Sequence, residues 1–393
     1  MVSVYNNLDK NFKYLLLLPY IFWLLLIFLY IFNSDSIKAG ELDGIIMYGK
    51  DSSRYINDAK NFLNLDFTGL HTSKITYIFL ISVIFFFNLS LSSIVIIQLL
   101  TTIISSICLY LIGKKLFSKW VGLVCLFFFF NYIPIQLRNF YILTEILFIN
   151  FSIILIYLCF FNQKHKILIF FLSSFILFLR PQGFLIILSL FFTFIIFGKL
   201  DKIYNTIFKI LLVVLSFSLL VFFINIGIKD YELISSLSRG EIWGYSFETN
   251  SICKRDCIAG LTNHTLYEKN IFGFLIYLKD NILILTKVAS FKIILFFSGW
   301  RPYYSNLHNI FIIFYHLPIY IFFCIHFFRK NKLNSFSTFT MVYIILNILF
   351  ISVTFVDWSG RFIMFILPFM MIYASKSIID IISIFIKRFL IKI

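Results

Sequence analysis

Charged side chains at the margins of long apolar runs are the residues of this sequence that could do chemistry. Glu145 opens one such run, in the segment LTEILF. A carboxylate at the start of a helix gains from the helix dipole, and Thr144 could cap the same helix, so a purely structural role is one interpretation. An acid this close to hydrocarbon is costly, however, and is a functional candidate by default. We favour a functional role for Glu145.

Arginines stand at several helix ends on the side that we expect to be outer, where orienting positive charge is normally scarce. They are Arg138, Arg180, Arg301 and Arg361, and Lys74 is a further candidate cation on that side. A guanidinium binds phosphate through a planar fork of donors, so these positions suit a phospholipid head. The alternative is that each arginine anchors its helix at the lipid boundary.

The segment YGKDSSRYINDAKNFL places an acid, Asp51, where a short helix is expected to begin. Asp51 or Ser52 would then cap the helix, which is the structural alternative to a catalytic role. Asp58 is expected on the opposite, solvated face, and Asp43 lies in a glycine-containing turn. These residues alone do not decide between Asp51 and Asp43 as the reactive acid. The face of the helix expected to pack carries Tyr55, Ala59 and Phe62.

Two cysteines, Cys253 and Cys257, flank the polar segment CKRDC, unlike the other four, which lie in apolar runs. If this segment faces an oxidising compartment, the pair can form a disulfide; free thiols are the alternative. Zinc would need two more ligands, and His264 supplies only one. We predict no cofactor, and a divalent metal is compatible with the available acids but not indicated by them.

Composition places the chain in a membrane. It is 61% hydrophobic and 13% charged, with a mean hydropathy of +0.95, whereas soluble domains are about half apolar and about a quarter charged. Apolar runs of roughly 17–25 residues recur and are long enough to cross a bilayer as helices. Barrel strands would be shorter and would alternate. The net charge of +16 lies in short loops, as orienting charge does, and does not indicate nucleic-acid binding.

The predicted fold class is all-α: a polytopic membrane helical bundle in the inner (plasma) membrane, with both termini cytoplasmic. Lysine-rich short loops set this orientation. The first outer loop spans 33–90 and includes an interfacial helix at 75–87, and the second outer loop spans 227–306 and ends in another at 281–300. About ten crossings are expected, at 14–32, 91–112, 120–135, 144–161, 166–179, 183–197, 203–226, 307–328, 336–355 and 362–382.

Several segments, taken in order, resemble the GT-C integral-membrane glycosyltransferases, specifically the protein O-mannosyltransferases and the lipid A aminoarabinose transferase. The first outer loop carries DSSRYINDAKNFL, and ITYIFLISVIFFFNLSLSSIVIIQLL is followed by the basic turn LYLIGKKLFSKWVG. RNFYILTEILFINF resembles the outer turn of that family, FLRPQGFLIIL its Arg-Pro step, and SGRFIMFILPFMMIYA its final helix. The resemblance covers roughly residues 1–200 and 355–375. The Asp-Glu pair of the mannosyltransferases is not reproduced by Asp51-Ser52, and no large soluble C-terminal domain follows.

The resemblance implies transfer of a sugar from a polyprenyl-phosphate donor to a hydroxyl of an acceptor lipid, glycan or protein at the outer face. Asp51 would be the base, and Glu145 would orient a sugar hydroxyl or an arginine. Arg180 and Arg361 would hold the phosphate first, then Arg138, Arg301 and Lys74. Two alternatives stay open: a polysaccharide polymerase or ligase using undecaprenyl-pyrophosphate glycans, and a multi-pass transporter or flippase. The chain lacks a P-loop and a GxGxxG, which argues against nucleotide-driven chemistry.

Overall fold

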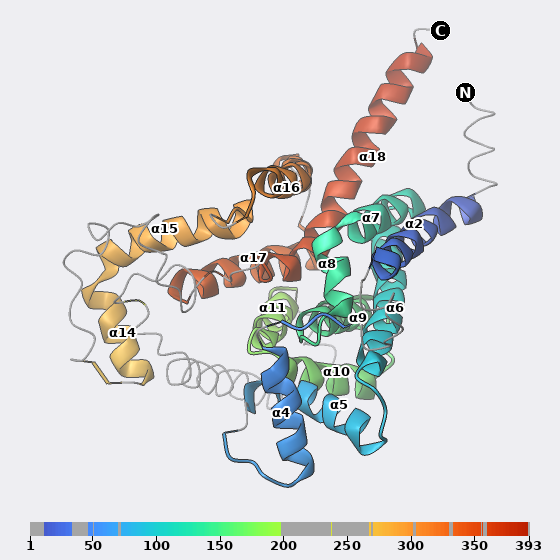
Figure 1. Cartoon of the computed structure of the whole chain (residues 1–393). Helices are drawn as coiled ribbons and strands as arrows, with labels where there is room; N and C mark the ends of the chain where they lie inside the picture. The colour runs from blue at the N-terminus through green and yellow to red at the C-terminus, as the bar shows by residue number, and fades with distance from the viewer. Residues whose placement is uncertain are drawn as a thin grey trace. The chain divides into compact units, whose positions relative to one another are not determined.

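The computed structural model is helical throughout the part of the chain that it describes. The described residues are 12–33, 46–49, 51–69, 72–197, 237, 267–268, 270–301, 304–329, 333–354, 356 and 360–391. Extended pairing among them is limited to an isolated parallel bridge between Met47 and Tyr141. An all-helical membrane protein was expected from composition, and the described residues confirm this coarser prediction (Figure 1).

Five described helices are long and apolar enough to cross a bilayer. Each overlaps one of the expected spans. They are α2 (Phe12–Asn33), α6 (Ser92–Leu116), α16 (Asn306–Phe328), α17 (Ser335–Val353) and α18 (Leu367–Ile391). A multi-pass membrane protein follows from these helices alone.

Two pairs of helices are bent and raise the number of candidate crossings to as many as seven among the described residues. Helix α7 (Lys119–Asn131) turns by 62° into α8 (Ile133–Leu137) and the 3₁₀ turn η3 (Arg138–Phe140), so the expected span at 120–135 is broken by a bend. Pro134, at the start of α8, suits a new helix rather than the interior of an old one. Helix α14 (Ile271–Asp280), which the sequence analysis did not predict, meets α15 (Ile282–Ser298) at 96°.

Four shorter apolar helices account for most of the remaining expected segments. Helix α5 (Ile75–Phe86) matches the expected interfacial helix. The other three coincide with expected spans, although each is short for a crossing: α9 (Glu145–Phe161), α10 (Lys166–Leu179) and α11 (Gly183–Ile196). The expected span at 203–226 lies outside the described residues. Helix α10 ends where Arg180 adopts an extended backbone, as expected for a residue that precedes proline.

The chain divides into two compact units. Unit 1 comprises Met1–Gly183, Ile319–Lys330 and Pro368–Ile393, and unit 2 comprises Phe184–Pro318 and Asn331–Leu367. In unit 1, α6 packs against both α7 and α9, α2 packs on α7, and α10 lies beside α9 and α5. In unit 2, α15 packs against α17, and Lys292 of α15 donates a hydrogen bond to the carbonyl of Thr354.

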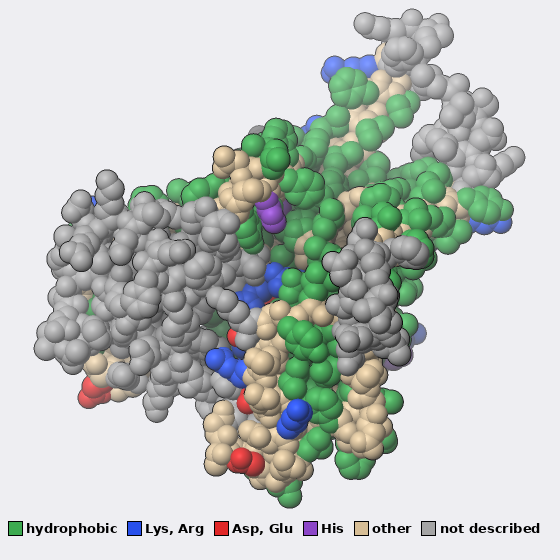
Figure 2. Space-filling view, viewed as in Figure 1, with side chains coloured by type: hydrophobic (Ala, Val, Ile, Leu, Met, Phe, Trp, Pro, Cys, Tyr) green, Lys and Arg blue, Asp and Glu red, His purple; other side chains and the backbone are tan. Residues whose placement is uncertain are grey.

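Helices α6 and α7 approach closely because glycines face each other. A Cβ on Gly113 would lie 2.9 Å from the Cα of Gly122, and one on Gly122 would lie 2.6 Å from the carbonyl oxygen of Tyr110. Small residues at such contacts let helix backbones pack tightly in lipid. Figure 2 shows apolar side chains over most of the described surface of α2 and α7, and polar and charged side chains over the short helix α4 (Ser52–Leu63).

The two ends of the helices in unit 1 differ in charge. Lys115, near the end of α6, donates to the hydroxyl of Tyr157 at 3.3 Å and to the carbonyl of Phe161, the last residue of α9, at 3.5 Å. Lys119, the first residue of α7, lies 4.9 Å from the ring centroid of Phe12 at the start of α2. Glu145 begins α9 at its other end. The lysines therefore gather at one end of these helices, as the short basic turns predicted.

Candidate functional site

The candidate site is built around the short segment that links η3 to α9. A buried hydrogen-bond network holds this segment to α6. The side-chain amide of Gln98 donates to the carbonyls of Asn139 at 2.7 Å and of Tyr141 at 3.1 Å. The Thr102 hydroxyl donates to Oδ1 of Asn139 at 2.7 Å. Since buried polar groups are costly unless they are bonded, these contacts fix the position of the segment.

Met47 and Ser52 of the first predicted loop dock onto the same segment. The backbone N–H of Met47 donates to the carbonyl of Phe140 at 2.8 Å. The hydroxyl of Ser52, which is fully buried, donates to the carbonyl of Ile142 at 3.0 Å and accepts from the N–H of Gly49 at 2.8 Å. Asp51, which precedes Ser52, is half-buried at the N-cap position of α4. Its side chain makes no capping hydrogen bond. The structure thus gives Asp51 the expected place but not a capping contact.

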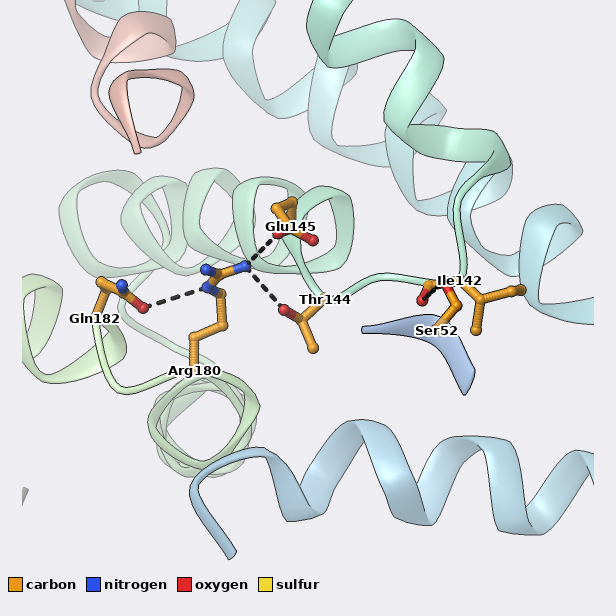
Figure 3. Close-up of polar contacts among 6 residues, drawn as sticks. All are labelled: Ser52, Ile142, Thr144, Glu145, Arg180 and Gln182. Carbon is orange, nitrogen blue, oxygen red and sulfur yellow. Dashed lines mark hydrogen bonds and ion pairs between the residues drawn. The ribbon is translucent and has the colours of Figure 1, made fainter. Parts of the chain in front are cut away.

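A buried ion pair joins α9 to the end of α10. Nη1 of Arg180 lies 2.8 Å from Oε1 of Glu145, and only 6% of Arg180 and 1% of Glu145 are exposed. The same Nη1 donates to the hydroxyl of Thr144 at 2.9 Å, and Nε donates to Oε1 of Gln182 at 3.2 Å (Figure 3). Thr144 precedes α9 without capping it through its side chain. Its hydroxyl instead accepts the hydrogen bond from Arg180.

The position of Asp58 corrects the sequence analysis. Asp58 is buried, with 8% exposed, and shares a face of α4 with Tyr55 and Ala59. Residues three and four apart lie on the same side of a helix, so Asp58 belongs to the face that carries Tyr55 and not to the opposite one. The expectation of a solvated Asp58 is therefore wrong. The packing of Tyr55 and Ala59 was expected correctly.

A cation and two tyrosines lie between α4, the 3₁₀ turn η2 (Thr72–Lys74) and α5. Nζ of Lys74 is 5.0 Å from the ring centroid of Tyr55, and the rings of Tyr55 and Tyr77 meet edge to face at 5.5 Å. Tyr77 is fully buried. Burial raises the pKa of its hydroxyl well above the usual value, and electrostatic interactions with Tyr55 and then Glu145 raise it further. Tyr77 therefore carries a neutral hydroxyl, on a helix that packs against α10.

The remaining arginines divide between the two units. In unit 1, Arg138 is half-buried in η3, with its guanidinium carbon 5.2 Å from the ring centroid of Tyr141. In unit 2, Nη1 of Arg301 donates to the carbonyls of Leu295 at 3.1 Å and Trp300 at 2.7 Å, at the end of α15. A cation there compensates the helix dipole. Arg301 is only 1% exposed, so these contacts favour a structural role inside the protein and not an anchor at the lipid boundary. Arg361 lies half-buried in a turn of unit 2.

Sequence reasoning missed the residues that hold the charged ones in place. Tyr77 and Gln182 were not singled out, and neither were the amides Gln98 and Asn139; Ser52 was considered only as a helix cap. One signal was present in the sequence: polar side chains inside apolar runs are retained only where they find partners. Asp43, Cys253 and Cys257 lie outside the described residues.

Metal ligation and similarity to known proteins add no further site. Among the described residues, no group of three or more His, Cys, Asp or Glu side chains could hold a metal ion. No protein-family model, curated protein or solved structure matches the chain. The functional argument therefore depends on the residues and their geometry.

Proposed function

We propose that the chain is a membrane glycosyltransferase that moves a sugar from a polyprenyl-phosphate donor to an acceptor hydroxyl at the outer face. The proposal includes about ten crossings, a GT-C-like arrangement and cytoplasmic termini. One observation carries it: the segment from Ile142 to Glu145 binds both the first-loop segment that carries Asp51 and the buried guanidinium of Arg180. An acid and a phosphate-binding group are what such a transfer requires.

The two attachments are close along the chain. Ser52 donates to Ile142, and Arg180 donates to Thr144, two residues further on. An extended chain advances by at most about 3.6 Å per residue, so the Cα atoms of Ile142 and Thr144 lie within about 7 Å of each other. Asp51 immediately precedes Ser52. This spacing supports placing Asp51 and Arg180 at one site.

The reaction is a single displacement. The Asp51 carboxylate takes the proton of the acceptor hydroxyl as the hydroxyl oxygen attacks the anomeric carbon. A carbon–oxygen bond forms to the acceptor, and the bond from the anomeric carbon to the phosphate oxygen breaks. The electron pair leaves with the polyprenyl phosphate, whose charge Arg180 stabilises in a site shielded from water. The anomeric centre inverts. Arg138 and Lys74 are further phosphate contacts of unit 1 under this proposal, and Arg361 and Arg301 stay predictions.

The test compares wild type with Asp51→Asn and Asp66→Asn. Purified protein in detergent receives radiolabelled sugar on a panel of polyprenyl phosphates, with a total envelope extract as acceptor. Asp66 is a matched control because it is an exposed acid of the same loop whose carboxylate accepts from the N–H and hydroxyl of Thr68. We expect Asp51→Asn to lower transfer at least about 100-fold and Asp66→Asn to leave it unchanged.

Other outcomes have defined meanings. Equal label from wild type and Asp51→Asn keeps the transferase but moves the base to Asp43 or Glu145. No label from any monosaccharide donor, with an acceptor verified as present, contradicts the proposal. That result would favour a polymerase or ligase acting on undecaprenyl-pyrophosphate glycans, or a transporter.

A further inference from the structure

Two nitrogens of the Arg180 guanidinium, Nη1 and Nε, already have side-chain partners in the structure. Nη1 pairs with Glu145 and donates to Thr144, and Nε donates to Gln182. A phosphate is bound most tightly by two parallel N–H donors of one guanidinium. An arriving phosphate group that binds through Nη1 must therefore take the donor position that Glu145 now occupies. The ion pair is the state of the site before the donor engages.

Displacing Glu145 creates a second requirement. A carboxylate that loses its arginine in a dry site must find another donor, because an unpaired buried charge is strongly unfavourable. Glu145 is 1% exposed, so water is a poor substitute at that position. The protein must supply the replacement from the elements that pack around α9 and α10.

Tyr77 has the properties of that replacement. Its hydroxyl is buried and makes no hydrogen bond in the part of the chain that the structure describes. It lies on α5, which packs against α10, the helix that ends at Arg180. An electrostatic effect of Glu145 on the pKa of this hydroxyl agrees with that placement. A buried hydroxyl without a partner costs free energy, so its retention needs a reason. A hydrogen-bond partner that is present in only one state of the site would be such a reason.

We propose that Tyr77 is a positioning residue for Glu145: its hydroxyl donates to the Glu145 carboxylate when the phosphate of a lipid-linked donor takes over the guanidinium of Arg180. The inference rests on the proposed function and adds a ligand-dependent exchange of partners to it. The exchange keeps both charges paired in either state, which lets a buried ion pair open without stranding either member.

The variant Tyr77→Phe removes only the hydroxyl and retains the ring that packs on Tyr55. Two effects of opposite sign are expected. Without ligand, the variant is at least as stable as wild type, with a melting temperature unchanged or raised by about 2 °C, because an unsatisfied group is lost. With ligand, affinity falls about tenfold or more, because Glu145 then lacks its donor.

The probe is undecaprenyl phosphate in detergent micelles, and undecaprenol is the uncharged control lipid. Binding is followed by ligand-induced thermal shift and by direct titration. Tyr277→Phe is the matched control variant, since Tyr277 is fully buried and its hydroxyl also makes no hydrogen bond within the described residues. It lies in unit 2, in a cluster with Leu237, Phe274 and Leu285. It should reproduce the effect without ligand and leave binding unchanged.

Weaker binding with retained stability, seen for Tyr77→Phe and not for Tyr277→Phe, supports the inference. A loss of stability with unchanged binding shows an ordinary structural role and overturns it, as does equal binding by wild type and both variants. Wild type that prefers undecaprenyl phosphate no more than undecaprenol overturns it as well. Failure of the proposed function is seen separately, as absence of sugar transfer by wild type.

Discussion

At the scale of single residues, the main finding is that Glu145 and Arg180 satisfy each other inside the protein. Sequence reasoning proposed that Glu145 orients a sugar hydroxyl or an arginine, and the structure pairs it with an arginine. Removing two charges from water costs several kcal/mol each, which only close geometry and additional hydrogen bonds offset. Thr144 and Gln182 supply those additional bonds. The pair can therefore be structural, functional or both, and measurements of stability and transfer separate these roles.

Glu145→Gln should strongly destabilise the protein. The substitution preserves shape but leaves the guanidinium of Arg180 buried without a balancing charge, a loss of about 3 kcal/mol or more. Thermal unfolding in detergent measures it. The control is Asp380→Asn, which breaks the partly exposed pair between Lys376 and Asp380 on α18 and should cost about 0.5 kcal/mol or less.

A double variant sharpens this test. Adding Arg180→Gln to Glu145→Gln removes both charges, so part of the lost stability should return. If Glu145→Gln lowers stability no more than Asp380→Asn does, Glu145 and Arg180 are not paired in a buried site. Recovery of stability without recovery of transfer would separate the structural contribution of the pair from the functional one.

At the scale of elements, a polar network binds α9 to α6. Asn150 of α9 accepts from the hydroxyl of Ser105 at 2.7 Å and donates to those of Thr101 at 3.1 Å and Thr102 at 2.9 Å. Thr102 in turn donates to Asn139, in the turn that leads to the ion pair. The network thus connects the middle of two apolar helices to the candidate site at their end.

Asn150→Leu should lower stability by about 1–2 kcal/mol, because the change leaves buried hydroxyls with fewer partners at nearly constant volume. Unfolding by heat or by sodium dodecyl sulfate measures the change. Asn347→Leu on α17 is the control: Asn347 is also buried, and its amide donates to the carbonyl of Tyr343 within its own helix. An equally large loss of stability for Asn347→Leu would mean that hydrogen bonds between helices contribute no more than those within a helix.

Apolar runs predicted most helices within a few residues, because length and hydropathy alone fix where a crossing can begin and end. They did not predict the bend between α7 and α8, since both sides of it are equally apolar. Asp58 was misplaced by an error of helical phase and not by lack of information. The pairing of Glu145 with Arg180 could not be predicted without tertiary structure. The two residues have 34 others between them in the sequence but are in contact in the fold.

At the scale of the whole molecule, the argument turns on which end of unit 1 faces outward. Helix α9 has 17 residues and is therefore about 25 Å long. The candidate site lies at its start, where Ser52 is docked on Ile142, and the basic turn containing Lys164 follows its end. Under the proposed function, the lysine end lies in the cytoplasm and the site outside, as the positive-inside rule predicts.

Two single cysteines test this orientation in a background in which all six native cysteines are replaced. Ser53→Cys lies on an exposed position of α4 beside the candidate site, and Lys164→Cys lies on an exposed position of the basic turn. We expect a membrane-impermeant maleimide to label Ser53→Cys in intact spheroplasts and Lys164→Cys only after the membrane is opened, because the proposed topology puts the two positions on opposite sides of the bilayer. The reverse pattern would place Asp51 and Arg180 in the cytoplasm. A donor presented at the outer surface could not reach them there, so the proposed transfer at the outer face would be excluded by topology alone.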